Sequence, residues 1–193
     1  MDDFFSIPGD VMRDAEAAAE FKLVVPETAR TSSRSADTFF WTEAGNLSKL
    51  QSGSYLSPDG IKVLTLEVEA TITASGSGAN IGRPVGTTFR IAPKALQSKG
   101  PKNLLTMSHM SLAKLKGFFA ALGIVPDRED GGFSGQLLLQ YFPLAEDQFP
   151  HDASPALNTE LFFQVKQSPY ETRDGETRTR PEIHRFLPGP SDV

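Results

Sequence analysis

The chain has 193 residues, of which 39% are hydrophobic, and a formal net charge of −5. This length favours one domain of about 150 residues with tails over two domains. Cysteine is absent, which excludes disulfides, thiolate nucleophiles and cysteine-ligated metal sites and is typical of a reducing compartment. With no signal-peptide pattern and no apolar run near the roughly 20 residues that cross a bilayer, we expect a soluble cytoplasmic protein that does not enter a membrane.

Composition divides the chain into three parts. Residues 1–38 join an alanine-rich stretch from about Asp10 to Phe21 to a polar segment of turn formers, which predicts an N-terminal arm that is part helical and part flexible. Residues 39–188 contain nearly all the strand patterns and form the predicted domain, and residues 189–193 are a short tail. Two roles are open for the arm: self-association, or competition of its acidic residues with nucleic acid for a basic face.

The first predicted elements of the domain are strands. From Lys62 to Thr73 apolar and polar residues alternate with a period of two, which predicts a strand with one buried face. A glycine-rich connection, Ser75 to Gly86, leads to a second strand at about Thr87 to Ile91. A short apolar run, Asn103 to Met107, predicts a third strand.

A helix is predicted next. Ser108 or Ser111 is its expected N-cap, Gly123 is the left-handed residue after its end, and Pro126 prevents its continuation. The apolar face of this helix consists of Leu112, Leu115, Phe118, Phe119 and Leu122.

Strands are predicted again in the last third of the domain. The run from Phe133 to Phe142 reads as a strand, and two further strands, Leu161 to Tyr170 and Thr177 to Phe186, flank Asp174-Gly175. This dipeptide favours a type I′ hairpin turn, in which both central residues have a positive φ. The order predicts a mainly β protein: a five-stranded OB-like barrel with one helix between strands 3 and 4 and a C-terminal β-hairpin extension.

Charge is distributed unevenly over these elements. Between Lys62 and Phe118, eight basic residues face only Glu67 and Glu69, so this segment carries about +6 within an acidic chain. Acidic residues are concentrated before and after it. A glycine-containing basic segment between strands is typical of a face that binds a polyanion. The alternative is that these lysines and arginines only keep the surface soluble.

Four sequence runs carry a resemblance to a known family. They are Arg83-Pro84-Val85-Gly86-Thr87-Thr88-Phe89-Arg90-Ile91, the helix end from Leu115 to Gly123, the start Gly135-Gln136 of a predicted strand, and the hairpin run Leu161-Phe162-Phe163-Gln164-Val165. Together they resemble phage-encoded OB-fold single-stranded-DNA-binding proteins, over roughly Ser54 to Pro188. The resemblance implies sequence-tolerant binding of single-stranded DNA in replication or recombination, in the host cytoplasm if a phage encodes the chain. The acidic C-terminal tail of many such proteins is missing, which puts recruitment of partners through a tail in doubt.

The candidate binding residues combine cations with flat side chains. Lysine and arginine hold phosphates, while a base stacks on an aromatic ring. Most aromatic residues are expected in the core, whereas Tyr55 and Tyr170 have polar neighbours. The predicted nucleic-acid-binding residues are Tyr55, Lys62, Arg83, Phe89, Arg90, Lys94, Lys99, Lys102, Tyr170, Arg173 and Arg178.

An enzymatic site is not predicted. His109, His151 and His184 are too far apart in the sequence to form a local metal motif. The glycine-rich segment lacks the lysine followed by serine or threonine that ends a P-loop. We therefore expect no catalytic residue, no metal and no cofactor. Two functions remain: a single-stranded-DNA-binding protein, or a structural or adaptor protein, for example a virion component, that uses the barrel and arm for protein contacts.

Overall fold

The computed structural model of the chain describes residues 6–24, 40–75, 80–144 and 153–189. Its strands are β1 (Phe40–Leu56), β2 (Lys62–Ser75), β3 (Pro84–Ile91), β4 (Glu160–Glu171) and β5 (Thr177–Leu187). Its helices are α1 (Gly9–Val24), α2 (Pro93–Ser98), α3 (Lys102–Ala121) and α4 (Gly135–Tyr141).

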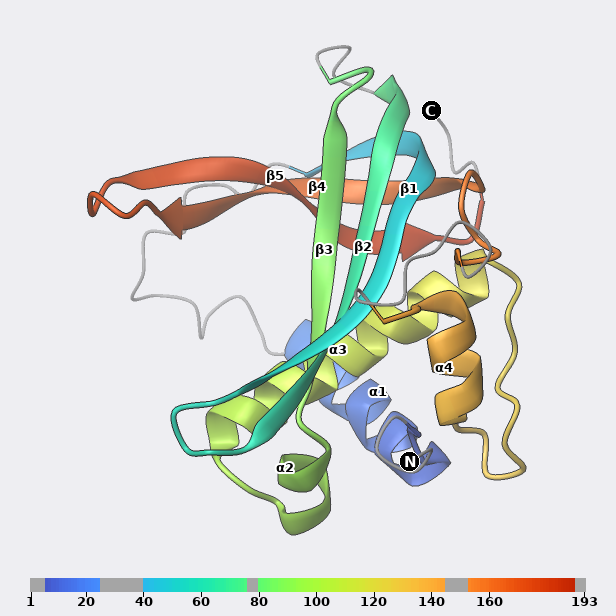
Figure 1. Cartoon of the computed structure of the whole chain (residues 1–193), viewed down its shortest axis with the longest axis vertical. Coiled ribbons are helices and arrows are strands. Elements are labelled where there is room, and N and C mark those ends of the chain that lie inside the picture. Colours follow the sequence, from blue (N-terminus) through green and yellow to red (C-terminus); the bar gives the residue numbers. More distant parts are fainter. Residues whose placement is uncertain (1–5, 25–39, 76–79, 145–152, 190–193) are drawn as a thin grey trace.

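The five strands form a closed sheet in the order β1-β2-β3-β5-β4 (Figure 1). Each neighbouring pair is antiparallel except β3 and β5, which are parallel and meet at one residue pair, Gly86 and Glu182. A mainly β protein with a closed five-stranded sheet was predicted, and this part of the prediction is confirmed. The closure between β3 and β5 has the least backbone pairing in the sheet.

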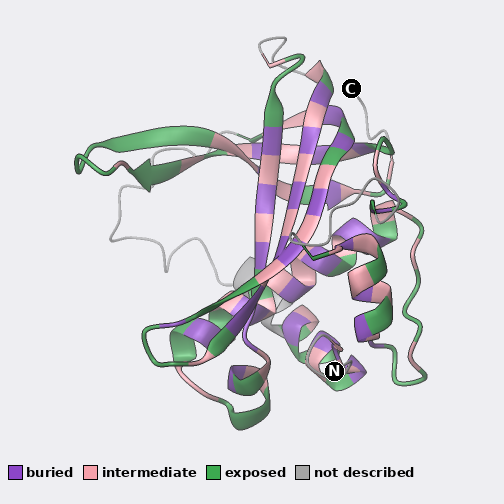
Figure 2. Ribbon diagram, in the orientation of Figure 1, coloured by how far each residue is buried: buried purple, intermediate pink, exposed green. Residues whose placement is uncertain are grey.

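The core lies between the sheet and α3. Buried and less buried residues alternate along β2 and β3 (Figure 2), as expected for strands with one face turned to the core. Helix α3 packs against β3 and β5, and the rings of Phe118 and Phe186 lie 4.9 Å apart between their centroids. None of the helices in the described ranges is both long and apolar enough to span a lipid bilayer.

Four predicted strands are confirmed with small changes at their ends: β2, β3, β4 and β5. The turn between β4 and β5 differs from the predicted type I′ turn. Within this turn only Gly175 has a positive φ, of 78°, and its N–H donates to the carbonyl of Thr172 over 3.0 Å. The central residues are therefore Arg173 and Asp174, and Gly175 follows them in the left-handed region.

The predicted strand Asn103 to Met107 is wrong, because these residues lie in α3, which begins at Lys102. The buried residues Leu104, Ser108 and Leu112 follow one another at a helical spacing of four, which a window of five residues does not reveal. Ser108 and Ser111 are not N-caps. Their hydroxyls accept from the backbone N–H groups of Ala92 and Arg90, both over 2.8 Å, and so join α3 to the end of β3.

The predicted strand Phe133 to Phe142 is also wrong, since most of it forms α4. The Ser134 hydroxyl accepts from the N–H of Leu137 over 3.1 Å and caps the helix. This serine, followed by residues that favour helices, was a signal in the sequence. Among the residues that the structure describes between β3 and β4, three helices, α2, α3 and α4, are therefore found, where one was predicted.

Strand β1 was not predicted as an element. Its alternation is interrupted by register shifts at Ala44/Gly45 and Leu47/Lys49, and it buries two polar residues, Glu43 and Ser52. Glu43 accepts from the Trp41 indole N–H over 2.7 Å and from the Ser75 hydroxyl over 2.8 Å. A strand with bulges and buried polar groups lacks the period-two signal on which sequence interpretation depends.

Helix α1 packs on α3 and contributes to the core. Ile7, Met12 and Ala15 are buried in the main hydrophobic cluster. Ile7 exchanges two backbone hydrogen bonds with Phe133, of 2.8 and 2.9 Å, and Glu16 forms an ion pair with Lys116 of α3. Residues 25–39 and 190–193 lie outside the described residues, so the predicted boundaries at residues 38 and 189 and self-association through the arm stay predictions.

Candidate nucleic-acid interface

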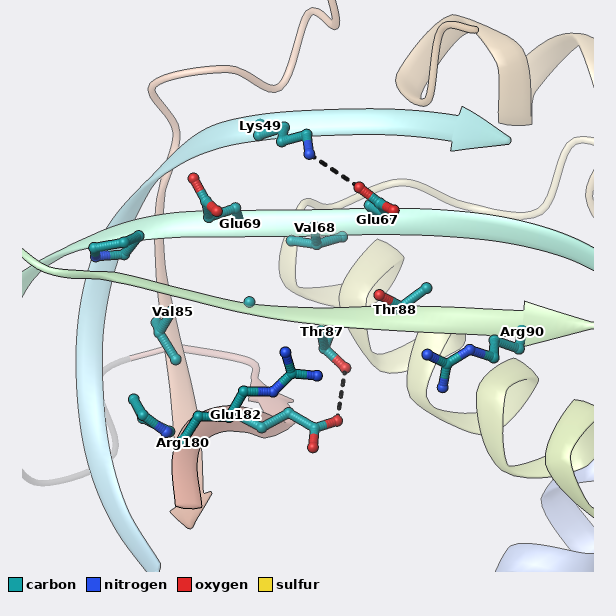
Figure 3. A pocket seen from close by; sticks show the side chains of 13 residues that line it. Lys49, Glu67, Val68, Glu69, Val85, Thr87, Thr88, Arg90, Arg180 and Glu182 are labelled. Atoms are coloured by element: carbon teal, nitrogen blue, oxygen red, sulfur yellow. Dashed lines mark hydrogen bonds and ion pairs between the residues drawn. The ribbon is translucent and has the colours of Figure 1, made fainter. Parts of the chain in front are cut away.

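A groove of about 370 Å³ lies between the outer face of β2 and β3 and the strand β5 (Figure 3). Its polar lining comes from four strands: Lys49, Glu67, Glu69, Thr87, Thr88, Arg90, Arg180 and Glu182. Glu67, Thr88 and Arg90 reach this face because their neighbours Leu66, Val68 and Phe89 point into the core. The groove contains three basic and three acidic side chains, so its local charge is balanced.

Glu67 is compensated within the groove. Its Oε2 accepts from Lys49 Nζ over 3.0 Å and from Gln51 Nε2 over 2.6 Å. The hydrogen bond from Lys49 is the largest influence on its pKa, which lies below the ordinary value although burial acts to raise it; Gln51 and the charge of Arg90 lower it further. The carboxylate of Glu67 therefore stays ionised and paired.

Lys114 of α3 joins β3 to β5 beside the groove. Its Nζ donates to Thr87 Oγ1 over 2.7 Å and to the carbonyl of Ile183 over 2.6 Å, and lies 3.8 Å from Glu182 Oε1. Burial lowers the pKa of Lys114 to about 8, and the charge of Glu182 opposes this shift. The lysine thus strengthens the closure of the sheet where backbone pairing is limited to one residue pair.

A pH dependence follows from the lowered pKa of Lys114. Between about pH 8 and 10.5 the folded protein has released this proton while the unfolded chain still binds it, so the free energy of unfolding rises with pH through this window. From about pH 8 to 10.5, the free energy of unfolding of the wild-type protein should rise by up to roughly 3 kcal/mol more than that of Lys114→Met. Urea unfolding at a series of pH values measures the difference. If the free energy of unfolding changes with pH in the same way in both proteins, the lowered pKa of Lys114 is contradicted. Lys114→Arg, which stays charged, serves as the control.

The hairpin formed by β4 and β5 carries basic and aromatic side chains on one face. Lys166 is paired with Glu182, Ser168 with Arg180, and Tyr170 with Arg178. Directly opposed residues share a face of the sheet, and so do residues two apart along a strand. The Arg180 guanidinium lies over the Tyr170 ring, 5.5 Å from its centroid. This face continues into the groove, because Arg180 and Glu182 belong to both.

The predicted residues Tyr170, Arg173 and Arg178 all lie on this hairpin and are exposed, and Arg90 lies in the groove. The predicted hairpin contains a third arginine, Arg180, besides Arg173 and Arg178, and it lies on the same face as Arg178. Sequence reasoning missed Lys166 and Lys49. For Lys166 the signal was present, since it precedes Tyr170 at an even spacing in a predicted strand.

A second group of predicted residues lies at the turn between β1 and β2 and around α2. Tyr55 and Lys62 flank this turn, Lys94 and Lys99 belong to α2 and its C-cap, and Lys102 begins α3. A small apolar cluster holds these segments together, with Val63, Ala92, Ala95 and Leu104 at its centre. In Figure 1 the β1–β2 turn and the β4–β5 hairpin both extend beyond β3 on the same side of the molecule.

Two predicted residues are separate from these groups. Arg83 is exposed and precedes β3, at the opposite end of that strand from Arg90. Phe89 was expected to stack on bases, and this is wrong: its side chain is 0% exposed. The Phe89 ring packs in the core, with centroids 6.1 Å from Phe118 and 6.3 Å from Phe142, because its position in β3 alternates with the outward residues Thr88 and Arg90.

No group of three or more histidine, aspartate or glutamate side chains within the described ranges is arranged to hold a metal ion. Comparison of the sequence with models of known protein families and with curated proteins finds no match. The support for a nucleic-acid interface is therefore the geometry and charge of these residues.

Proposed function

We propose that this protein binds single-stranded DNA with little dependence on sequence, in phage DNA replication or recombination, and that its sheet is an OB-type barrel. The observation that carries the proposal is the shared face of Tyr170, Arg178 and Arg180, which continues into the groove beside Arg90. Cations that hold phosphates next to a ring that accepts a base are the combination found in sequence-tolerant single-strand binders.

The topology supports this proposal. OB-folds bind oligonucleotides on the face of strands 2 and 3 and with the loops that follow strands 1 and 4. In this chain the groove lies on the outer face of β2 and β3, and the β1–β2 and β4–β5 connections both extend beyond β3 on the same side of the molecule (Figure 1). The order β1-β2-β3-β5-β4, with β3 parallel to β5, is the order in which OB-folds close.

The ionic pairing in the groove favours the same function. Glu67 is paired with Lys49, and Glu182 lies near Lys114, so two of the three carboxylates have cationic partners. Arg178, Arg180 and Arg90 are exposed and are positioned to contact phosphates. Arg178 is paired with Glu176 over 3.0 Å, but an exposed ion pair contributes so little that a phosphate can replace the carboxylate. Tyr55 and Tyr170 are 43% and 38% exposed, and partly exposed rings of this kind offer surface on which a base can stack.

A fluorescence anisotropy titration with single-stranded and duplex oligonucleotides tests the proposal. We expect the wild-type protein to prefer the single strand and its affinity to fall steeply with salt. Replacing Arg90 and Arg180 together with alanine should weaken binding and reduce the log–log salt slope by about 1.4, since each phosphate contact contributes about 0.7 on a single strand.

Arg13→Ala is the matched control, because Arg13 is an exposed arginine on α1, away from the groove residues. Unchanged affinity in a folded Arg90/Arg180 variant would remove the groove from the binding site. Absence of any oligonucleotide binding by the wild-type protein at low salt would contradict the function and favour the structural or adaptor alternative.

A further inference from the structure

Two aromatic rings from different strands meet on the outside of the sheet. Phe40 begins β1, and His184 lies in β5. Their ring centroids are 4.7 Å apart, with an angle of 43° between the ring planes. Phe40 is 43% exposed, so a large apolar side chain is left partly in water beside a half-buried histidine.

The strand register places Phe40 on the same face as the hairpin cations, and His184, which falls at the register shift of the β4–β5 pair, reaches this face through its ring contact with Phe40. Phe40 is directly opposite Lys166 of β4, and Lys166 is directly opposite Glu182 of β5. The same face continues through Arg180 to Tyr170. The order along this face is therefore aromatic, cationic, aromatic, from the base of the hairpin toward its tip.

The surroundings of His184 are basic. Burial is the largest cause of its lowered pKa, and the charges of Lys166, Lys114 and Arg185 lower it further, against the opposing charge of Glu182. The imidazole is therefore neutral at pH 7 and lies in a positive local field. A neutral ring pair in such a field suits a base with its phosphate, because the ring face accepts the base while the lysine attracts the phosphate.

We infer that Phe40 and His184 form a second base-stacking platform, and that a single strand runs along the outer face of β4 and β5 from Tyr170 to Phe40 with Lys166 and Arg180 at its phosphates. This inference rests on the proposed function. From Lys166 to Tyr170 the strand advances about 13 Å at roughly 3.3 Å per residue, the length of about four stacked nucleotides at about 3.4 Å each.

Anisotropy titrations with oligothymidines of increasing length test the platform. Phe40→Ala should weaken binding of long oligonucleotides at least about fivefold, the lower limit for loss of one stacked base, and affinity should stop rising at a shorter length than in the wild-type protein. Phe40→Tyr, which keeps the ring, should retain wild-type binding. Val125→Ala removes an exposed apolar side chain outside this face and should change nothing.

Photo-crosslinking provides a readout that needs no substitution. Oligonucleotides that carry 5-iododeoxyuridine should crosslink to Phe40 or His184 in the wild-type protein, as located by mass spectrometry. His184→Ala, with its fold checked by circular dichroism, replaces Phe40→Ala if the latter does not fold.

The outcomes separate the inference from the proposed function. If folded Phe40→Ala and His184→Ala keep wild-type affinity and length dependence, or if crosslinks occur only elsewhere, the platform is overturned while the function stands, provided that the Arg90/Arg180 variant is weakened. If the wild-type protein binds no oligonucleotide at low salt, the function itself fails.

Discussion

Replacing Met12 with aspartate is expected to lower the free energy of unfolding by about 3 kcal/mol or more. Met12 is 4% exposed and belongs to the main hydrophobic cluster. An aspartate at this position would place an unpaired carboxylate in that cluster, or α1 would have to leave its place on α3. The first residue of α1 is already held closely: a β-carbon at Gly9 would overlap the backbone oxygen of Asp130.

The neighbouring position provides the control. Arg13 is exposed, and its side chain donates one hydrogen bond, of 3.3 Å, to the carbonyl of Asp130, so Arg13→Asp should lower stability by no more than about 1 kcal/mol. Chemical denaturation of both variants makes the comparison. Equal stability of the two variants would show that α1 does not pack on the domain, and would favour the predicted independent arm. A large loss in Met12→Asp alone would place residues 7–15 within the folded unit.

Replacing Phe89 with alanine is expected to cost about 3–5 kcal/mol of stability, the range measured for large aromatic residues in cores. Its ring contacts three others, those of Phe118, Phe142 and Phe186, so the substitution leaves a cavity that α3 and the sheet fill only in part. The change should leave the stacking surface of Tyr170 intact in whatever fraction of the protein remains folded.

Tyr170→Ala is the paired comparison, because both rings were predicted to stack on bases. Tyr170 is exposed on the hairpin face, so this variant should keep wild-type stability within about 0.5 kcal/mol. Its dissociation from a single strand should be faster, because loss of a stacking contact worth about 1–3 kcal/mol acts mainly on the off-rate. Stability is measured by thermal unfolding and dissociation by stopped flow. A stable Phe89→Ala variant would contradict the burial of this ring.

Local patterns in the sequence were sufficient to predict β2 and the β4–β5 hairpin. The alternation from Lys62 to Thr73 predicted β2, and the two runs around Asp174-Gly175 predicted the β4–β5 hairpin. Residue type and neighbours alone make Tyr170 and Arg178 candidate binding residues, and the strands pair them directly. The predictions of β2 and of the hairpin strands are confirmed because period-two alternation and a turn glycine depend on residues close together in the chain.

Other elements were decided by tertiary packing. The runs Asn103 to Met107 and Phe133 to Phe142 are short and apolar, and such runs do not distinguish a strand from a helix until their neighbours are known. In the structure each packs as a helix. Strand β1 is extended because β2 and β4 pair with its two edges, and this pairing outweighs its irregular pattern.

The candidate site shows the same division. Composition identified a basic segment from Lys62 to Phe118, yet the fold distributes its cations: Lys114 bridges β3 and β5, Lys116 pairs with Glu16, and Arg83 lies apart from Arg90. Phe40 and His184 are 144 positions apart in the sequence. They meet because β4 pairs with β1 on one edge and with β5 on the other. Residue types and alternation are properties of the chain alone, whereas the face that residues share depends on strand register, which is set by long-range pairing and closure of the sheet.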